Sequence, residues 1–259
     1  MSSLAALSRR LARLGEISSV MAAMKNLALV ESRKLARCAE AQQRMQANIE
    51  VALADFLAFH PQPGVVSGPS LLVVIGSERG FCGNFNARLR AAVPGENREE
   101  RPILVGQRLA ARWPEGTVPP LVVAGATVTE EIPAVLARLL AAIQSAAGGR
   151  IAILAHDGGE IALTPVLPLP PPAAPCWRQP PRLQLPPAEL FAALLDQYLP
   201  AVLERALSAS LAAENRQRLT HMENALDRLD ETLAALTLKK NALRQEQIVE
   251  EIEVMLSGR

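Results

Sequence analysis

The residues best placed to support chemistry lie in one glycine-bearing turn, which follows an apolar run and precedes a helical pattern. Such a turn can present backbone N–H groups to an anion at a helix N-terminus. Its glycines, Gly76, Gly80 and Gly83, lack the GxGxxG spacing of dinucleotide-binding turns, and no Gly-Lys-Ser/Thr motif follows. Two interpretations remain. We prefer a tight structural turn in which Asn84 or Asn86 caps the next helix. The alternative is a turn that binds a phosphate in a small α/β enzyme.

Cys82 lies in the same turn, where a helix N-terminus could activate its thiol as a nucleophile. A catalytic cysteine also needs a histidine base. The chain has only three histidines, His60, His156 and His221, and nothing in the sequence brings one of them to Cys82. No pair of histidines or cysteines has the spacing of zinc ligands, and the paired carboxylates are adjacent residues. The residues therefore favour neither a nucleophilic cysteine nor a zinc site, and we predict no metal site and no cofactor.

Composition narrows the class of protein. The apolar content is 49% but the aromatic content only 3%, a leucine- and alanine-rich balance typical of long helices. The net charge of +1 gives no reason to expect nucleic acid or an anionic membrane as a partner. No apolar run reaches the roughly 18 residues that a membrane span needs. The three scattered cysteines indicate reduced thiols in a cytosolic protein, which could still dock on a membrane complex.

Long helices are predicted at both ends of the chain. Residues 201–257 contain no proline or glycine, and their leucines recur at alternating spacings of three and four, the seam of a coiled coil. Residues 1–60 show the same repeat, diluted by polar residues in the middle. We expect the segment 1–60 to pair with the C-terminal helices, 189–259, as an antiparallel coiled coil, and Pro200 to kink or split the C-terminal helix.

In the middle of the chain, the apolar residues no longer follow a helical repeat. Short continuous apolar runs alternate with helix-like stretches, which indicates βαβ units and a mostly parallel sheet. We therefore predict a Rossmann-like α/β domain over 69–165, inserted between the two helices, followed by an extended proline-rich connector over 166–188. An SH3-type ligand is an alternative for the connector. The expected strands are 71–75, 102–105, 121–124 and 151–155, and the expected helices are 84–92, 108–113 and 129–147.

The end of the last helix departs from the leucine seam. Polar residues interrupt it from Lys239 to Gln245, and the apolar register then shifts to Ile248, Ile252 and Met255. A frayed helix end would explain this pattern. Alternatively, the helix leaves its partner here and is held by another protein. The cationic residues of the first helix are likewise open to two interpretations, a solvated face or a contact with an acidic partner.

Three separated stretches carry a more specific pattern. They are residues 11–35 (LARLGEISSVMAAMKNLALVESRKL), residues 77–86 (SERGFCGNFN) and residues 213–252, which include Asn241, Arg244, Gln245 and Ile248. In this order and at these separations, they resemble the gamma subunit of F-type ATP synthases. Departures from the family pattern, such as Lys240 in place of a tyrosine and Val249 in place of a threonine, indicate a divergent branch, for example an alternative ion-translocating ATPase.

The resemblance implies a non-catalytic rotor subunit. Its coiled coil would stand inside a ring of alpha and beta subunits and couple proton or sodium translocation to ATP synthesis or hydrolysis at the beta subunits. The α/β domain would lie outside the ring and touch the epsilon subunit and the c-ring. The chain would then be a peripheral protein on the cytoplasmic side of the bacterial plasma membrane. The alternatives are the phosphate-binding enzyme considered above and a helical adaptor of another assembly.

The resemblance also implies roles for single residues. Contact with the beta subunit is expected of Met24, Lys25, Arg244, Gln245 and Glu251. Contact between the two helices is expected of Glu214, Arg218 and Met222. A structural role in the glycine-bearing turn is expected of Gly80, Cys82, Gly83 and Asn86. The C-terminal tip around Met255 would sit in an apolar sleeve.

Overall fold

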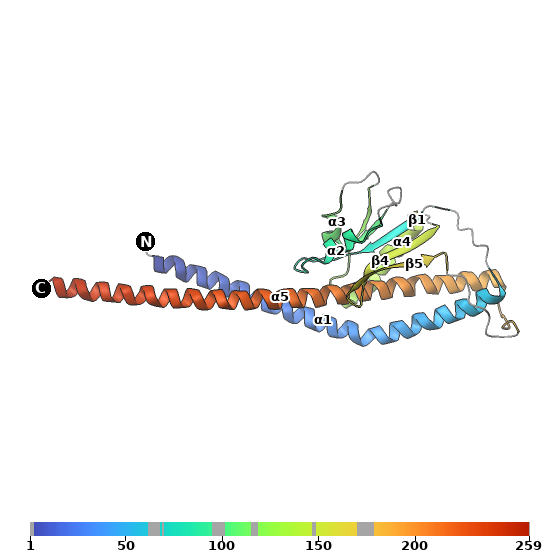
Figure 1. Ribbon diagram of the computed structural model, residues 1–259. Helices are drawn as coiled ribbons and strands as arrows, with labels where there is room; N and C mark the ends of the chain where they lie inside the picture. The colour runs from blue at the N-terminus through green and yellow to red at the C-terminus, as the bar shows by residue number, and fades with distance from the viewer. Residues whose placement is uncertain are drawn as a thin grey trace. The chain divides into compact units, whose positions relative to one another are not determined.

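The computed structural model describes residues 3–61, 68, 70–94, 102–114, 119–146, 149–169 and 179–258. Two long helices, α1 (Ser3–Phe59) and α5 (Pro187–Ser257), stand at the ends of the chain, and a five-stranded sheet lies between them in sequence (Figure 1). The chain divides into two compact units, which we describe separately. Unit 1 comprises residues 1–29 and 218–259, and unit 2 comprises residues 30–217, so each long helix contributes to both.

The long helices begin and end close to the predicted positions, with one correction. α1 ends at Phe59, just before Pro61, as predicted. Pro200, which we expected to kink or split the last helix, lies inside an unbroken α5. A proline inside a helix removes one backbone hydrogen bond. The neighbouring Tyr198 and Leu203 are buried, and this packing against the core of unit 2 offsets the loss.

The sheet has the strand order β3-β2-β1-β4-β5. Its parallel strands are β1 (Ser70–Ile75), β2 (Ile103–Val105), β3 (Leu121–Val123) and β4 (Arg150–Asp157), which match the four apolar runs. The helices between them are α2 (Phe85–Ala91), α3 (Gln107–Ala110), the 3₁₀ turn η1 (Thr129–Glu131) and α4 (Ile132–Ala146). This is the mostly parallel α/β domain that the sequence predicts.

Strand β5 (Glu160–Leu167) was not expected from the sequence. It pairs antiparallel with β4 and contains Pro165, which cannot donate to a ladder and is tolerated at a sheet edge such as this one. The strand reaches the first residues of the expected proline-rich connector. The central part of that connector, 170–178, lies outside the described residues. The SH3-ligand interpretation concerns this part and stays a prediction.

Both faces of the sheet are covered. In β1, the odd-numbered side chains such as Val73 pack with α4 and with the α5 side chains Leu203, Leu207 and Leu211. The even-numbered side chains such as Val74 pack with α2 and α3. This double coverage explains why the strands read as continuous apolar runs rather than alternating ones.

Within unit 2, α1 and α5 run in opposite directions. The rings of Phe56 and Phe191 are stacked with centroids 5.9 Å apart, and the Gln42 amide donates to Glu204 (3.1 Å) and Ser208 (3.2 Å). A later residue of α1 therefore meets an earlier residue of α5, as in the predicted antiparallel pair.

Within unit 1, the predicted seam is the less exposed side of each helix. On α1 the half-buried seam residues are Leu4, Leu7, Leu11, Leu14, Ser18, Met21 and Lys25. On α5, Met222 is buried, and Leu219, Leu226, Leu229, Leu233, Leu236 and Leu243 are half-buried. Among the residues that the structure describes, no helix is long and apolar enough to cross a membrane.

We expect Gly106→Ala to destabilise unit 2 by about 1–3 kcal/mol. Gly106 has φ of +112°, and a Cβ added there would lie 2.6 Å from the backbone oxygen of Ser77. Urea unfolding followed by tryptophan fluorescence measures this change, because Trp113 belongs to unit 2. The control is Gly15→Ala, where a Cβ would meet no atom within 4 Å. Unfolding of Gly106→Ala at the wild-type urea concentration would contradict the argument.

Candidate functional site

The glycine-bearing turn between β1 and α2 is closed by its own side chains. The Asn86 amide donates to Ser77 Oγ (2.8 Å), and Asn86 Oδ1 accepts from the Ser77 backbone N–H (3.0 Å). The buried Cys82 thiol lies 3.4 Å from Ser77 Oγ and 3.8 Å from the Arg79 carbonyl oxygen. Gly76 permits this close packing, because a Cβ at that position would lie 2.5 Å from Leu109 Cβ of α3 and 2.9 Å from Asn86 Oδ1. The hydrogen bonds of Asn86 serve the turn itself.

Our expectation that Asn84 or Asn86 caps α2 is wrong. Asn84 stands at the N-cap position but makes no capping hydrogen bond with its side chain. Its Oδ1 instead accepts from the Gln217 amide of α5 at 2.6 Å. Gly83, with φ of +59°, brings the chain close to this contact, since a Cβ there would lie 3.5 Å from Gln217 Nε2. A Cβ added at Gly80 would lie 3.9 Å from Arg108 Nε. The turn therefore fastens the sheet to α5.

Glu78 occupies the place where an anion would be expected. Its Oε2 accepts from the backbone N–H groups of Gln107 (2.9 Å) and Gly125 (2.8 Å), which follow β2 and β3. Open α/β sheets usually bind ligands just beyond the carboxyl ends of their strands. Here a carboxylate of the chain itself satisfies two backbone donors that a ligand at this edge of the sheet would use. The glycine-bearing turn, where the sequence left a phosphate site open, is closed by Ser77 and Asn86.

The topological switch point of the sheet, between β1 and β4, is reached by α5. Buried Ser210 donates to the carbonyl oxygen of Ile75, the last residue of β1 (3.1 Å). At the end of β4, Asp157 accepts from Arg205 (3.2 Å). Ligands of doubly wound sheets bind at the switch point. In this chain, the α5 side chains Ser210 and Arg205 take the place of such a ligand.

Cys82 and His156 do not form a nucleophile–base pair. The His156 ring is buried and stacks on Phe85 with centroids 3.9 Å apart, and its Nε2 lies 3.3 Å from the Phe85 carbonyl oxygen. Burial lowers the pKa of His156 and so favours the neutral ring. The described residues also contain no group of three or more histidine, cysteine or acidic side chains that could hold a metal ion.

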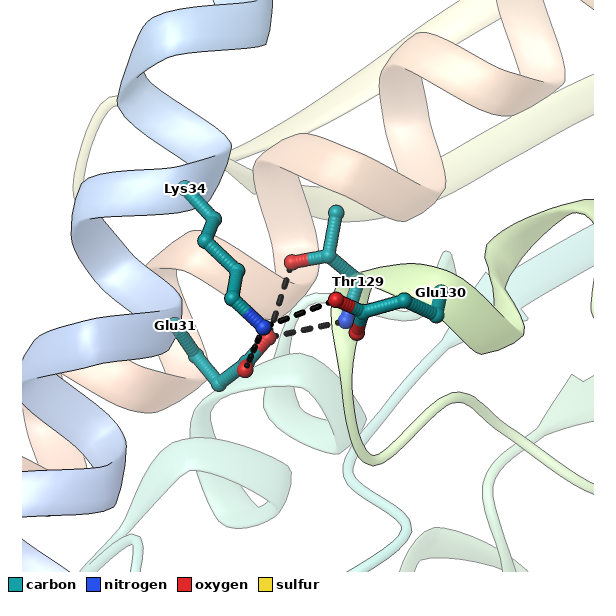
Figure 2. A network of polar contacts seen from close by, with 4 residues as sticks. All are labelled: Glu31, Lys34, Thr129 and Glu130. Carbon is teal, nitrogen blue, oxygen red and sulfur yellow. Dashed lines mark hydrogen bonds and ion pairs between the residues drawn. The ribbon is translucent and has the colours of Figure 1, made fainter.

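A polar network joins α1 to the start of η1 (Figure 2). Glu31 is buried, with 2% of its surface exposed, and its Oε2 accepts from the backbone N–H (2.9 Å) and the hydroxyl (2.8 Å) of Thr129. Lys34 donates to Glu31 Oε1 (2.9 Å) and to Glu130 Oε1 (2.7 Å). Burial alone would raise the pKa of Glu31, but the hydrogen bonds from Lys34 and Thr129 lower it overall.

The sequence did not reveal this network, because its partners are 98 residues apart. From the sequence, we made no prediction for Glu31 and considered Lys34 only as one of the cationic residues of the first helix. Glu78 and Ser210 were also missed. A carboxylate after a strand and a serine in a leucine-rich helix carry no signal of the backbone groups that they satisfy. Only the fold brings those donors and acceptors together.

The residues expected at helix–helix and beta contacts are placed as follows. In unit 2, Glu214 is buried. In unit 1, Arg218 and Met222 are buried, Met24 is half-buried, and Lys25 Nζ lies 3.1 Å from Glu223 Oε1.

The three other expected beta contacts lie on the exposed end of α5. Arg244, Gln245 and Glu251 are exposed, and so are the apolar side chains that follow them. Val254, Met255 and Leu256 are 70–75% exposed. Beyond Gln247, every described residue of α5 is exposed. This end can therefore make contacts outside the chain, with apolar and polar side chains together.

A sheet whose ligand positions are filled by its own side chains, joined to two long helices, defines a structural subunit. The family model described as ATP synthase matches residues 3–259. The ATP synthase gamma chain of Ruminococcus albus is 25% identical over 274 residues, which cover 95% of each chain. The chloroplastic gamma chain of Spinacia oleracea is 40% identical over 72 residues, covering 28% of this chain and 20% of the relative.

The fold agrees with this match. The chain is similar to a chain in a structure of the Euglena gracilis mitochondrial ATP synthase, with a TM-score of 0.66, 15% identity and coverage of 98% of this chain and 93% of the other. This chain belongs to the gamma-subunit family of ATP synthases. It is a non-catalytic rotor subunit of the central stalk.

We expect Glu78→Ala to destabilise unit 2 by about 1–3 kcal/mol, because two backbone N–H groups lose their acceptor. Sulfate should then stabilise Glu78→Ala more than it stabilises the wild-type chain, since the vacated donors can bind an anion. Urea unfolding in sulfate and in chloride at equal ionic strength measures both effects. Glu160→Ala, at an exposed position of β5, is the matched control. Equal sulfate effects on all three chains would contradict an anion-like role for Glu78.

The pH dependence of the Glu31 network follows from the lowered pKa of its carboxylate. The ordinary pKa is 4.5, so the stabilisation is present above that pH and is lost as pH falls through the lower folded value. We expect wild type to melt at a higher temperature than Glu31→Gln at pH 7 and the difference to shrink toward pH 3. Thermal melts over this range check the trend. A difference that grows in acid would contradict it.

Proposed function

We propose that this subunit couples ion translocation, of protons or sodium ions, to ATP synthesis or hydrolysis at the beta subunits of the complex. The observation that carries the proposal is the C-terminal end of α5, a helix end with exposed apolar side chains and no buried residue beyond Gln247. A helix end with several such side chains needs an apolar environment outside the chain. A sleeve formed by the ring of alpha and beta subunits would supply it.

The proposed partners are the alpha and beta subunits, the c-ring and the epsilon subunit. The Euglena gracilis structure to which the chain is similar is described as an assembly of OSCP, F1 and the c-ring, which supports the first three. The epsilon contact rests on the family resemblance alone. We propose a peripheral location on the cytoplasmic side of a bacterial plasma membrane.

The proposed beta contacts use polar side chains near the end of α5. Arg244 and Gln245 are exposed and together offer several donors to carboxylates or carbonyl groups of a facing loop. Glu251, one to two turns further on, would meet a cationic or amide group. Lys25 is paired with Glu223, but both side chains are partly exposed, and such a pair contributes only about 0–1 kcal/mol. Lys25 can therefore exchange Glu223 for a beta carboxylate at little cost, next to Met24.

Coupling follows from contacts that differ between states. A subunit shifts the conformation of its neighbours only by as much as its interaction energy differs among their conformations. Polar contacts from one side of a helix end meet each surrounding beta subunit at a different angle. Rotation would present them to each beta subunit in turn and so change the state of each catalytic site in order.

Co-expression with alpha and beta subunits tests the proposal. We expect the wild-type chain to co-purify with both in an ATP-hydrolysing complex and Gln245→Leu to weaken assembly or coupling, while its helix content by circular dichroism stays at the wild-type value. Gln197→Leu makes the same change at an exposed position of α5 in unit 2 and serves as the control. Wild-type assembly and coupling by Gln245→Leu would refute the contact. A chain that binds neither alpha nor beta subunits would refute the function.

A further inference from the structure

The two long helices are attached to the α/β domain of unit 2 in different ways. α5 is embedded, because most of its side chains between Tyr198 and Asn215 are buried in the two core clusters or hydrogen-bonded to the sheet. α1 is attached at separate points. It buries Glu31 and Leu35, and then no side chain until Leu53.

The stretch of α1 between those points is loosely packed. A groove of about 580 Å³, partly open to solvent, is lined by residues of α1, of α5 and of the end of β4, among them Ser32, Ala39, Ala212 and Asp157. The hydroxyl oxygen of Ser32 and the side-chain carbonyl oxygen of Gln46 are buried without a hydrogen-bond partner. The heptad pattern is diluted here because its seam residues are small or polar. These residues leave space between the two helices. Packing alone therefore holds this part of α1 weakly.

Glu31 stands at the point where α1 passes from unit 2 into unit 1, whose boundary lies between Leu29 and Val30. Its carboxylate accepts two hydrogen bonds from one residue, Thr129, at 2.8 and 2.9 Å (Figure 2). Charge-assisted bonds of this kind are among the strong and directional ones. Thr129 is the first residue of η1, which leads directly into α4, and the α4 residues Ile132 and Val135 are in the core. The contact therefore ties α1 to a rigid part of the domain.

We propose that Glu31 is a positioning residue for coupling, through which load passes between the α/β domain and α1. The inference rests on the proposed function. A rotating subunit transmits torque to both helices only if both are fixed to the domain where they leave it. α5 is fixed there by its buried face and by the Gln217–Asn84 hydrogen bond (2.6 Å). For α1, the Glu31–Thr129 contact does this together with the buried Leu35. Further along α1, Gln42 bonds to α5 rather than to the sheet or α4, and the next buried side chain is Leu53.

Three variants and a control test this role in the assembled ATPase complex. Glu31→Gln removes the charge, Thr129→Val removes the hydroxyl donor, and Thr129→Ser keeps it. Glu40→Gln neutralises an exposed carboxylate of the same helix, which pairs with Arg44. The measurement is ATP-driven ion pumping relative to ATP hydrolysis. Hydrogen–deuterium exchange of the full-length chain follows the backbone of residues 30–52.

We expect Glu31→Gln and Thr129→Val to assemble and hydrolyse ATP but to pump fewer ions per ATP. Exchange in residues 30–52 should become about tenfold faster, as expected when a buried charge-assisted bond is lost. Thr129→Ser and Glu40→Gln should match the wild type in both measurements. If the Glu31→Gln chain does not assemble, the Thr129→Val chain tests the inference by itself. That variant retains the Glu31 carboxylate and the backbone N–H of residue 129, so it is the milder change.

Two results would overturn the inference. Faster exchange with unchanged ion pumping per ATP would mean that the contact only stabilises α1. Unchanged exchange would mean that the contact does not hold α1 at all. Both results are distinct from failure of the proposed function, which would appear as a wild-type chain that does not assemble with alpha and beta subunits.

Discussion

Burial of one side of α5 against the sheet is the interaction on which unit 2 depends. Leu203, Leu207 and Leu211, spaced by four residues, pack on the odd-numbered side chains of β1. Each fully buried leucine contributes about 1.5–3 kcal/mol. This contact carries α5 unbroken through Pro200 and brings Ser210 to the end of β1. The part of α5 that packs on the sheet is therefore part of the core of unit 2.

In the part of the sheet that the structure describes, polar groups at the usual ligand position of this topology are bound by side chains of the chain itself. Donors at the ends of β2 and β3 bind the Glu78 carboxylate, and the end of β1 binds Ser210. Asn84, at the start of α2, binds Gln217. These polar groups fasten the domain to itself or to α5. The fold is thus used for attachment and leaves catalysis to other subunits.

The attachment of α1 follows a different physical rule from that of α5. Apolar burial is spread over many residues and tolerates small changes at each. A buried carboxylate depends on a few directional bonds, so its effect is concentrated at one position. Glu31 and Thr129 give α1 such a position beside a stretch with little packing. A subunit that transmits load can use both kinds of attachment, one broad and one local.

The sequence alone determined the two terminal helices, the four parallel strands and the family, because these depend on local periodicity and on short motifs. Tertiary structure decided the rest. It made residues 160–167 an edge strand, carried α5 through Pro200 and directed Asn84 to Gln217 rather than to a helix cap. It also paired Glu31 with a residue 98 positions away. A repeat records which side of a helix is buried, but a hydrogen bond between distant residues exists only once the fold has brought donor and acceptor together.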